Sequence, residues 1–376
     1  MSEEKIVHRC DSCGGTMIFD TRSQTLKCPN CGSCQEIVDE RTTREHALHE
    51  YESTKVSAQE KHSSTMECSG CGAQIELDER SSAVSCPYCG SSIVLAQRQL
   101  SSILPDGLRP FQIDKNKAAE IFREWIRKRG LAPNELKRLY QQDRMMGIYL
   151  PYWTFDAQMS SPYSAMGGND YQVEYTDSDG NTKYRTETEW YPVSGRVEAF
   201  FDDVLIRASE TLRPDLLRAI GNFNTKALVS YSPAYISGFA AEVHTIEFGR
   251  AHSEARSEMD GRTEAMIRSE VLARYDRVRD IHMSPQYSRE TYKHILLPLY
   301  STAYAYKGKT FQVLINGETG TIHGDYPKSI VKIGLIILAV LIVLALIYFF
   351  TRQADASAFF SDFQEIAYLE EYSVIS

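Results

Sequence analysis

The chain has 376 residues, which is enough for two or three domains with buried cores. It carries 41 Lys and Arg against 50 Asp and Glu, a net charge of -9, so the chain as a whole is not built to attract nucleic-acid backbones or anionic lipid. The charged start MSEEKIVHRC predicts no secretory signal, and we expect the N-terminal part to stay in the cytosol with reduced thiols.

Eight of the nine cysteines form four Cys-x-x-Cys pairs, arranged twice with the same spacing. Each pair is followed by glycine, which tolerates the positive φ of a tight knuckle turn. Four thiolates suit the tetrahedral coordination of Zn²⁺ and leave no open position for catalysis. The sequence therefore predicts two structural Zn²⁺ sites in two small β zinc ribbons, at residues 1–36 and 65–97. A rubredoxin-like iron site is the alternative. The predicted ligands are Cys10, Cys13, Cys28 and Cys31 in the first ribbon and Cys68, Cys71, Cys86 and Cys89 in the second.

Residues 16–19 and 25–26 in the first ribbon, and 74–77 and 83–85 in the second, are expected to form short strands. Cys34 has no counterpart in the second ribbon, so we interpret it as a spare thiol, with a reactive or sensing role as the alternative. Residues 37–64 predict a charged, solvated linker. His46, His49 and Glu50 within it are interpreted as part of a charged face, because their order does not match a metalloprotease helix.

Residues 98–327 predict an α+β domain with an antiparallel sheet. A helix is expected over residues 118–126, strands from 149 onward, and a hairpin turn at Asp179 and Gly180. Residues 213–280 look mainly helical, with one side lined by Ile267, Val271, Val278 and Ile281. The segments YLPYW and LLPLY, each at the start of a β region, hint at a duplicated sheet element. No phosphate loop, nucleophile elbow or His/Cys constellation occurs here, so we predict no enzyme, no catalytic or cofactor-binding residue and no small-molecule substrate.

Residues 328–351 predict one transmembrane helix. The stretch from Ile333 to Phe350 has no charge and would extend over roughly 27 Å, close to the apolar thickness of a bilayer. A buried core helix is the alternative, but this stretch has no polar stripe. Lys328 and Lys332 precede it and Arg352 follows, which favours a cytoplasmic N-terminal side. The expected localisation is the cell membrane, in a single pass, with residues 352–376 as an acidic extracytoplasmic tail.

The ribbons, the segments YLPYWTFDA and YKGKTFQVLINGETG, and the C-terminal span together carry a resemblance over nearly the whole chain. The chain resembles bacterial membrane-anchored proteins with a zinc ribbon of the transcription-factor-IIB type, which are often labelled replication- or helicase-related. The resemblance implies a cytosolic domain held at the lipid bilayer that recruits protein partners, including SPFH-domain proteins of envelope-stress systems in some relatives. Two ribbons in place of one depart from that pattern and leave the partner open.

The leading hypothesis from the sequence is a membrane-anchored zinc-ribbon adaptor whose ribbons dock a cytosolic protein. The alternative is nucleic-acid binding by the ribbons, which requires a basic face. Residues 1–100 contain 10 Lys and Arg against 15 Asp and Glu, so Arg22, Lys27, Arg80 and Arg98 are outnumbered and nucleic acid is disfavoured as a partner. A third hypothesis, an enzyme in residues 98–327, would need an acid/base pair meeting in a pocket.

Overall fold

The computed structural model describes residues 8–38, 43–51, 62–68, 73–76, 86, 97–101, 104–134, 145–306 and 309–349. The chain divides into two compact units: unit 1 comprises residues 1–122 and 141–325, and unit 2 comprises residues 123–140 and 326–376. Unit 1 holds most of the residues that the sequence assigns to two ribbons, a linker and an α+β domain, but residues 123–140 and 326–327 of the expected α+β domain fall in unit 2.

A small antiparallel sheet forms near the N-terminus of unit 1. It contains β1 (Ile18–Asp20), β2 (Thr25–Lys27) and β3 (Cys34–Gln35), in that spatial order. The turn between β1 and β2 places Gln24 at φ 56°, in the left-handed region. We call residues 8–38 the first cysteine unit. Its strands β1 and β2 agree with the sequence prediction to within two residues, whereas β3 was not predicted.

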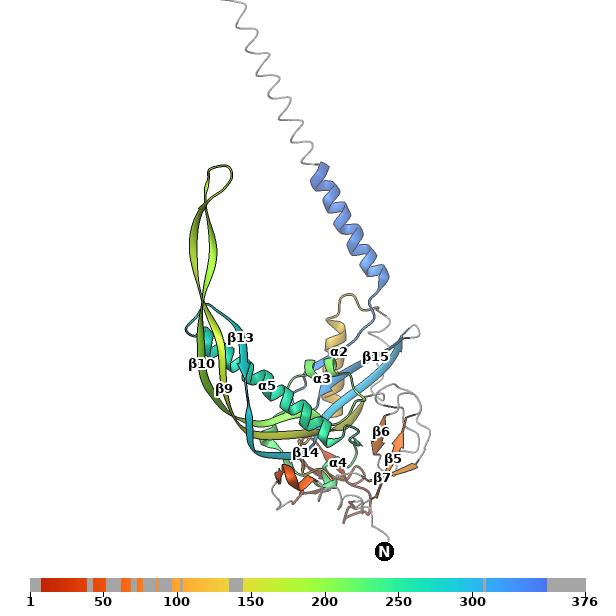
Figure 1. Ribbon diagram of the computed structural model, residues 1–376. Helices are drawn as coiled ribbons and strands as arrows, with labels where there is room; N and C mark the ends of the chain where they lie inside the picture. Colours follow the sequence, from red (N-terminus) through yellow and green to blue (C-terminus); the bar gives the residue numbers. More distant parts are fainter. Residues whose placement is uncertain are drawn as a thin grey trace, which may run out of the picture. The chain divides into compact units, whose positions relative to one another are not determined.

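A much larger, strongly curved sheet dominates unit 1 (Figure 1). At its centre β9 (Met146–Thr176) pairs antiparallel with β10 (Thr182–Arg207) on one side and β14 (Gln286–Tyr306) on the other. The predicted hairpin turn at Asp179 and Gly180 is confirmed, with Gly180 at φ 83°. Further strands of this sheet are β4 (His46–Ala47), β5 (His62–Glu67), β6 (Gln74–Glu76), β7 (Gln97–Ser101), β8 (Gly107–Leu108), β11 (Val229–Ser230), β12 (Ala240–Glu242), β13 (Arg277–Met283), β15 (Lys309–Asn316) and β16 (Ile322–Gly324).

The two proline-containing segments that hinted at duplication are paired neighbours in this sheet. Pro151 of β9 lies opposite Leu296 of β14, and Pro298 of β14 lies opposite Tyr149 of β9. On the side of β9 that faces away from β14, the paired strand changes from β12 to β10 at Pro151. On the side of β14 that faces away from β9, the paired strand changes from β8 to β15 at Pro298. Proline has no N–H to donate. Its position at a change of partner therefore leaves the regular ladders on both sides intact.

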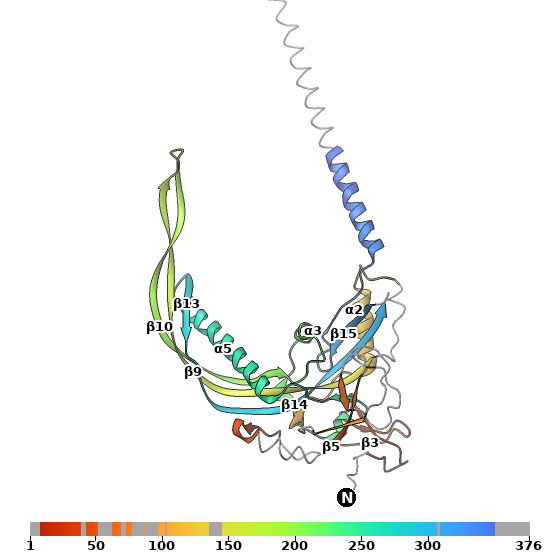
Figure 2. The ribbon, with the colours of Figure 1, turned by 45° about the vertical axis from the view of Figure 1, so that its right-hand side comes forward.

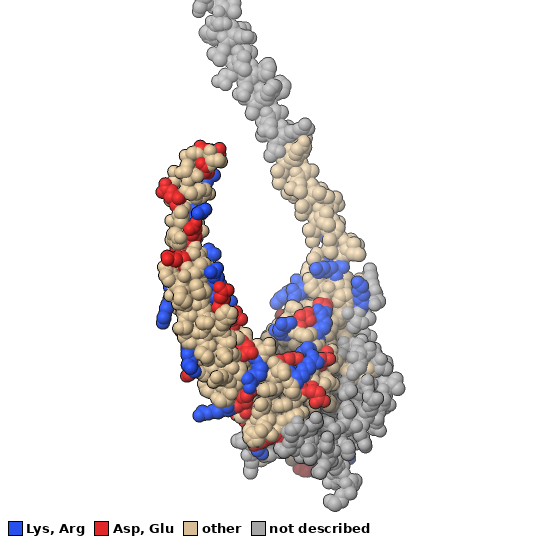
Figure 3. Space-filling model, viewed as in Figure 1, with Lys and Arg blue, Asp and Glu red and all other residues tan. Residues whose placement is uncertain are grey.

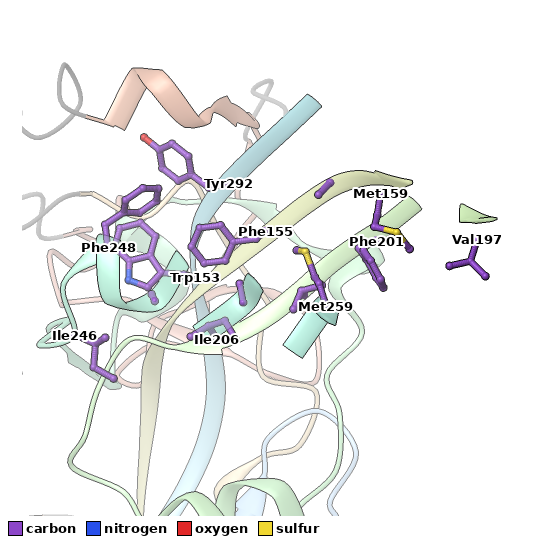
Figure 4. Packing of buried hydrophobic residues seen from close by; sticks show 14 of the residues in the cluster. Trp153, Phe155, Met159, Val197, Phe201, Ile206, Ile246, Phe248, Met259 and Tyr292 are labelled. Atoms are coloured by element: carbon purple, nitrogen blue, oxygen red, sulfur yellow. The ribbon is translucent and has the colours of Figure 1, made fainter. Parts of the chain in front are cut away.

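The main core lies between this sheet and α5 (Phe248–Leu272), which runs along the concave side of the sheet (Figure 2). One face of α5 is buried at Phe248, Ala251, Ala255, Met259, Thr263, Ile267 and Val271. Figure 4 shows Phe248 and Met259 meeting Trp153, Phe155 and Met159 of β9. Spacing of three or four residues along the helix explains the continuous contact.

The helical prediction for residues 213–280 is correct only in part. Besides α5, this region contains α3 (Pro214–Ala219), η3 (Thr225–Ala227), α4 (Pro233–Ile236) and the short strands β11 and β12. Ile267 and Val271 lie on the buried face of α5 as expected, but Val278 and Ile281 belong to β13, which pairs with β9. Long-range strand pairing overrides the local helical pattern there.

Residues 43–51, part of the expected solvated linker, are docked on the sheet. β4 pairs with β14, and the short helix η1 (Leu48–Glu50) follows. The Tyr51 ring stacks on Phe248 at a centroid distance of 3.9 Å. His46 Nε2 lies 2.6 Å from Asp106 Oδ1, so this histidine is held by a carboxylate.

Unit 2 is built on the C-terminal helix, Ile330–Phe349, which is long and apolar enough to cross a membrane, and none of which is buried. This confirms the predicted helix within residues 328–351. The last residues of α2 (Lys115–Arg127) and the loop after it also belong to unit 2. Ser329 N donates to Leu131 O at 2.8 Å, and Trp125 packs edge-on against Tyr326.

Candidate metal centre

Four thiols converge in the first cysteine unit. The Sγ atoms of Cys10, Cys13, Cys28 and Cys31 all lie within 4.8 Å of one another, with Cys10 to Cys31 at 3.4 Å and Cys13 to Cys28 at 3.5 Å. Tetrahedral coordination at a metal–sulfur distance near 2.3 Å places sulfur atoms about 3.8 Å apart. The four-thiol group therefore has the size that a metal ion of this kind requires.

Two backbone turns with the same hydrogen bonds hold these thiols. Cys10 N donates to Gly15 O at 2.7 Å and Gly14 N donates to Cys10 O at 2.8 Å. In the second turn, Cys28 N donates to Ser33 O at 2.8 Å and Gly32 N donates to Cys28 O at 2.9 Å. Gly14 and Gly32 both have positive φ, 69° and 78°, which explains the glycine after each pair.

The environment of Cys31 favours the thiolate, which is the ligating form. Hydrogen bonds from the hydroxyl and the amide of Ser33 lower the pKa of the Cys31 thiol to about 6. Cys34 is exposed and donates to Gly32 O at 3.6 Å, and it is not one of the four converging thiols.

Part of the second predicted site can be compared with the first. Cys68 and Cys86 are buried, and Cys68 N donates to Ala73 O at 2.8 Å, the same five-residue bond that Cys10 and Cys28 make. Cys71 and Cys89 lie outside the described residues. Around these cysteines β5 pairs with β6 and β7, and β6 pairs with β12 of the large sheet.

The first cysteine unit is mounted on the rest of unit 1. Phe19 is 4% exposed, and its ring lies edge-on to Tyr235 with centroids 5.4 Å apart and tilted against Phe239 at 6.4 Å. Phe19 N donates to Ser237 O at 3.1 Å, and Ser237 Oγ donates to Met17 O at 2.9 Å. Sequence reasoning missed this contact, since nothing in residues 16–27 distinguishes a strand that packs on another element.

Two of the three Lys and Arg residues of the first cysteine unit pair with acids, and the third, Arg9, donates to Gly14 O. The Arg22 guanidinium forms an ion pair with Asp114, and Lys27 Nζ lies 3.9 Å from Asp20 Oδ2. Arg80 and the side chain of Arg98 lie outside the described residues. The described part of the unit therefore offers few cations to a phosphate backbone.

The carboxylates of Asp156, Asp202 and Asp203 also lie close enough together to hold a metal ion. A lysine ammonium group lies beside them and balances part of their negative charge. Asp202 and Asp203 lie where the pairing of β10 with β9 shifts register, and Asp203 has φ 50°. Lys293 Nζ lies 2.7 Å from Asp203 Oδ1 and 3.0 Å from Glu45 Oε1. Burial raises the pKa of Asp156, and its two oxygens accept hydrogen bonds from Asp203 N at 2.6 Å and Thr291 Oγ1 at 3.1 Å.

The chain is similar to the uncharacterized protein YdjG of Bacillus subtilis (strain 168). The two are 25% identical over 326 residues, which cover 86% of this chain and 91% of that protein. No protein-family model matches the chain. No solved structure matches it either.

Proposed function

We propose that the chain is a membrane-anchored zinc-ribbon scaffold that recruits a cytosolic protein to the bilayer. The observation that carries the proposal is the C-terminal helix, whose apolar side chains have no covering within the described chain. A helix of this composition in water would expose a very large apolar surface, whereas a bilayer covers it on all sides. In the proposal, the helix serves as a single-pass anchor, with the rest of the chain on the cytoplasmic side.

Two structural zinc ions complete the proposed scaffold. The four-thiol group would bind one ion through Cys10, Cys13, Cys28 and Cys31, and the second cysteine unit would bind the other through Cys68, Cys71, Cys86 and Cys89. The size of the first group and the repeated turn at Cys68 support this assignment. Such ions would fix short segments that have too little apolar core to fold alone.

The surface best suited to a partner is the end of the β9–β10 hairpin, residues 169–190. Beyond Gly168 the described part of β9 pairs with β10 alone, because β13 begins at Arg277, opposite Gly168. Two-stranded hairpins are marginal in isolation. Yet this one exposes Tyr171 by 47% and Tyr184 by 65% of their surface. Aromatic side chains of this kind are enriched at protein interfaces.

Fractionation of cells tests the proposal. The tagged full chain and a form ending at residue 327 would be compared, and proteins that copurify after gentle detergent extraction would be identified by mass spectrometry. We expect one protein to follow the tagged chain, in the membrane fraction with the full chain and in the soluble fraction with the shortened form. A partner that stays at the membrane with the shortened form would contradict the proposal.

Two further variants test whether the partner binds the hairpin or the first cysteine unit. Tyr171→Ser with Tyr184→Ser removes exposed aromatics of the hairpin, whereas Cys10→Ser with Cys13→Ser removes half of the first thiol group. Loss of the partner in the tyrosine variant alone would assign docking to the hairpin, and loss in the cysteine variant alone would assign it to the first cysteine unit. Copurification of nucleic acid without protein would refute the scaffold and favour a nucleic-acid-binding protein.

A further inference from the structure

Positive charge is concentrated at the start of the C-terminal helix, against the sign of the whole chain. Within the described residues of unit 2, 123–134 and 326–349, there are six Lys and Arg and a single Glu. Figure 3 shows Lys and Arg side chains where the apolar helix begins. We call this group the basic collar; its members are Arg123, Arg127, Lys128, Arg129, Lys328 and Lys332.

The collar is held together by contacts across about 200 residues of sequence. Lys332 Nζ lies 3.1 Å from Gly130 O, 2.7 Å from Ala132 O and 3.0 Å from Asn134 Oδ1. These three acceptors match the three protons of an ammonium group. The loop after α2 is therefore fixed beside the first turn of the C-terminal helix.

Arg129 adds a second attachment. Its guanidinium carbon lies 4.8 Å from the centre of the Trp125 ring and 5.5 Å from that of Tyr326. Cation–π contacts of this kind order the arginine between α2 and the segment that enters the helix. Arg127, Lys128 and Lys328 are exposed, and Lys128 Nζ lies 3.8 Å from Glu124 Oε2.

We propose that the basic collar binds the anionic phospholipid headgroups of the leaflet at which the C-terminal helix enters the membrane. Lys332 is the residue directly before Ile333, where the uncharged stretch starts, and its contacts with Gly130 and Ala132 hold the loop after α2 beside this apolar boundary. Attraction to an anionic lipid surface extends over about one Debye length, roughly 8 to 10 Å. The proposal requires the exposed collar residues to lie within this range of the headgroup phosphates.

The collar also affects the prediction of which side of the membrane the N-terminal part of the chain lies on. Sequence counting finds two lysines before the helix, but the fold adds four cations from α2 and its loop, some 200 residues away in the chain. Positive charge close to a span favours the cytoplasmic side. The inference stands apart from partner recruitment, because it requires only that the helix enters a bilayer.

The test uses the full-length protein in vesicles of phosphatidylcholine with and without phosphatidylglycerol. After mild detergent extraction, native mass spectrometry counts the lipids of each kind that stay bound. The variant Arg127→Gln, Lys128→Gln, Lys328→Gln removes three exposed collar charges. The matched control Arg250→Gln, Arg262→Gln, Arg268→Gln removes three exposed charges from α5 in unit 1.

We expect the unaltered chain and the α5 control to retain phosphatidylglycerol in preference to phosphatidylcholine. Each cation near an anionic surface contributes a factor of about five, so the collar variant should lose up to about a hundredfold of the preference. The charge-keeping variant Arg127→Lys, Lys128→Arg, Lys328→Arg should keep it.

Four results would overturn the proposal. The first is equal retention of both lipids by the unaltered chain. The second is an unchanged preference in the collar variant, and the third is a loss of the preference in the charge-keeping variant. The fourth is displacement of phosphatidylglycerol by inorganic phosphate at low concentration, which would assign the collar to a soluble phosphate compound in place of the membrane surface.

Discussion

Phe19→Ala tests whether the first cysteine unit is a structural part of unit 1. The Phe19 side chain is 4% exposed and packs against Tyr235 and Phe239. Burying a phenylalanine contributes about 1.5 to 3 kcal/mol, and each edge-to-face aromatic contact adds about 0.5 to 1.5 kcal/mol. With the cavity left behind, we expect the variant to lose about 3 to 5 kcal/mol of unfolding free energy.

Urea unfolding followed by the near-ultraviolet circular dichroism of the aromatic core measures this loss. The metal content of the variant should equal that of the unaltered chain, because the four thiols and their turns are untouched. Ile18→Ala on the same strand is the matched control. Ile18 is 41% exposed, so its truncation should cost at most about 1 kcal/mol. Equal effects of the two variants, or a loss below about 1 kcal/mol for Phe19→Ala, would refute the mounting of this unit through Phe19.

Three other predictions concern the metal, pH and close packing. Cys31→Ser should lower the bound zinc by about one equivalent in elemental analysis, whereas Cys34→Ser should not change it. Burial favours the protonated form of Glu290, but hydrogen bonds from a histidine and an arginine of α5 outweigh it and lower its pKa. Its contribution is present above the unfolded pKa of about 4.3 and lost as pH falls through the lower folded pKa, so the urea midpoints of the unaltered chain and Glu290→Gln should converge on acidification. Gly167→Ala should destabilise by about 1 to 3 kcal/mol in urea because the added methyl would lie 2.5 Å from the Tyr275 ring, whereas Gly249→Ala, with open space around it, should be neutral or slightly stabilising.

The features predicted correctly from the sequence are those set by short-range patterns. The spacing of Cys10, Cys13, Cys28 and Cys31 was enough to group four thiols, since each knuckle is a local turn. The hairpin at Asp179 and Gly180 and the apolar C-terminal helix also depend on neighbouring residues. In each case the chemistry that fixes the structure is contained within about twenty residues.

The features that escaped prediction depend on distant partners. Arg277–Met283 contains charged residues in a helical context, and only pairing with β9 makes it a strand. Residues 43–51 have the composition of a solvated linker, and their docking becomes evident only from the stacking of Tyr51 on Phe248. The mounting of the first cysteine unit joins Phe19 to residues more than 200 positions later. A pattern among neighbouring residues in the sequence does not predict contacts between residues so far apart.

The docking of residues 43–51 on β14 has a consequence for biosynthesis. The ion pair of Glu45 with Lys293 joins residues 248 positions apart. At about 5 to 20 residues per second, a ribosome needs roughly 12 to 50 s to produce the second partner after the first. The Cys-x-x-Cys turns need only local chain and are complete long before. In the proposed scaffold, the first cysteine unit would therefore bind its zinc ion and fold before the large sheet exists, and would dock on that sheet's neighbouring segments only later.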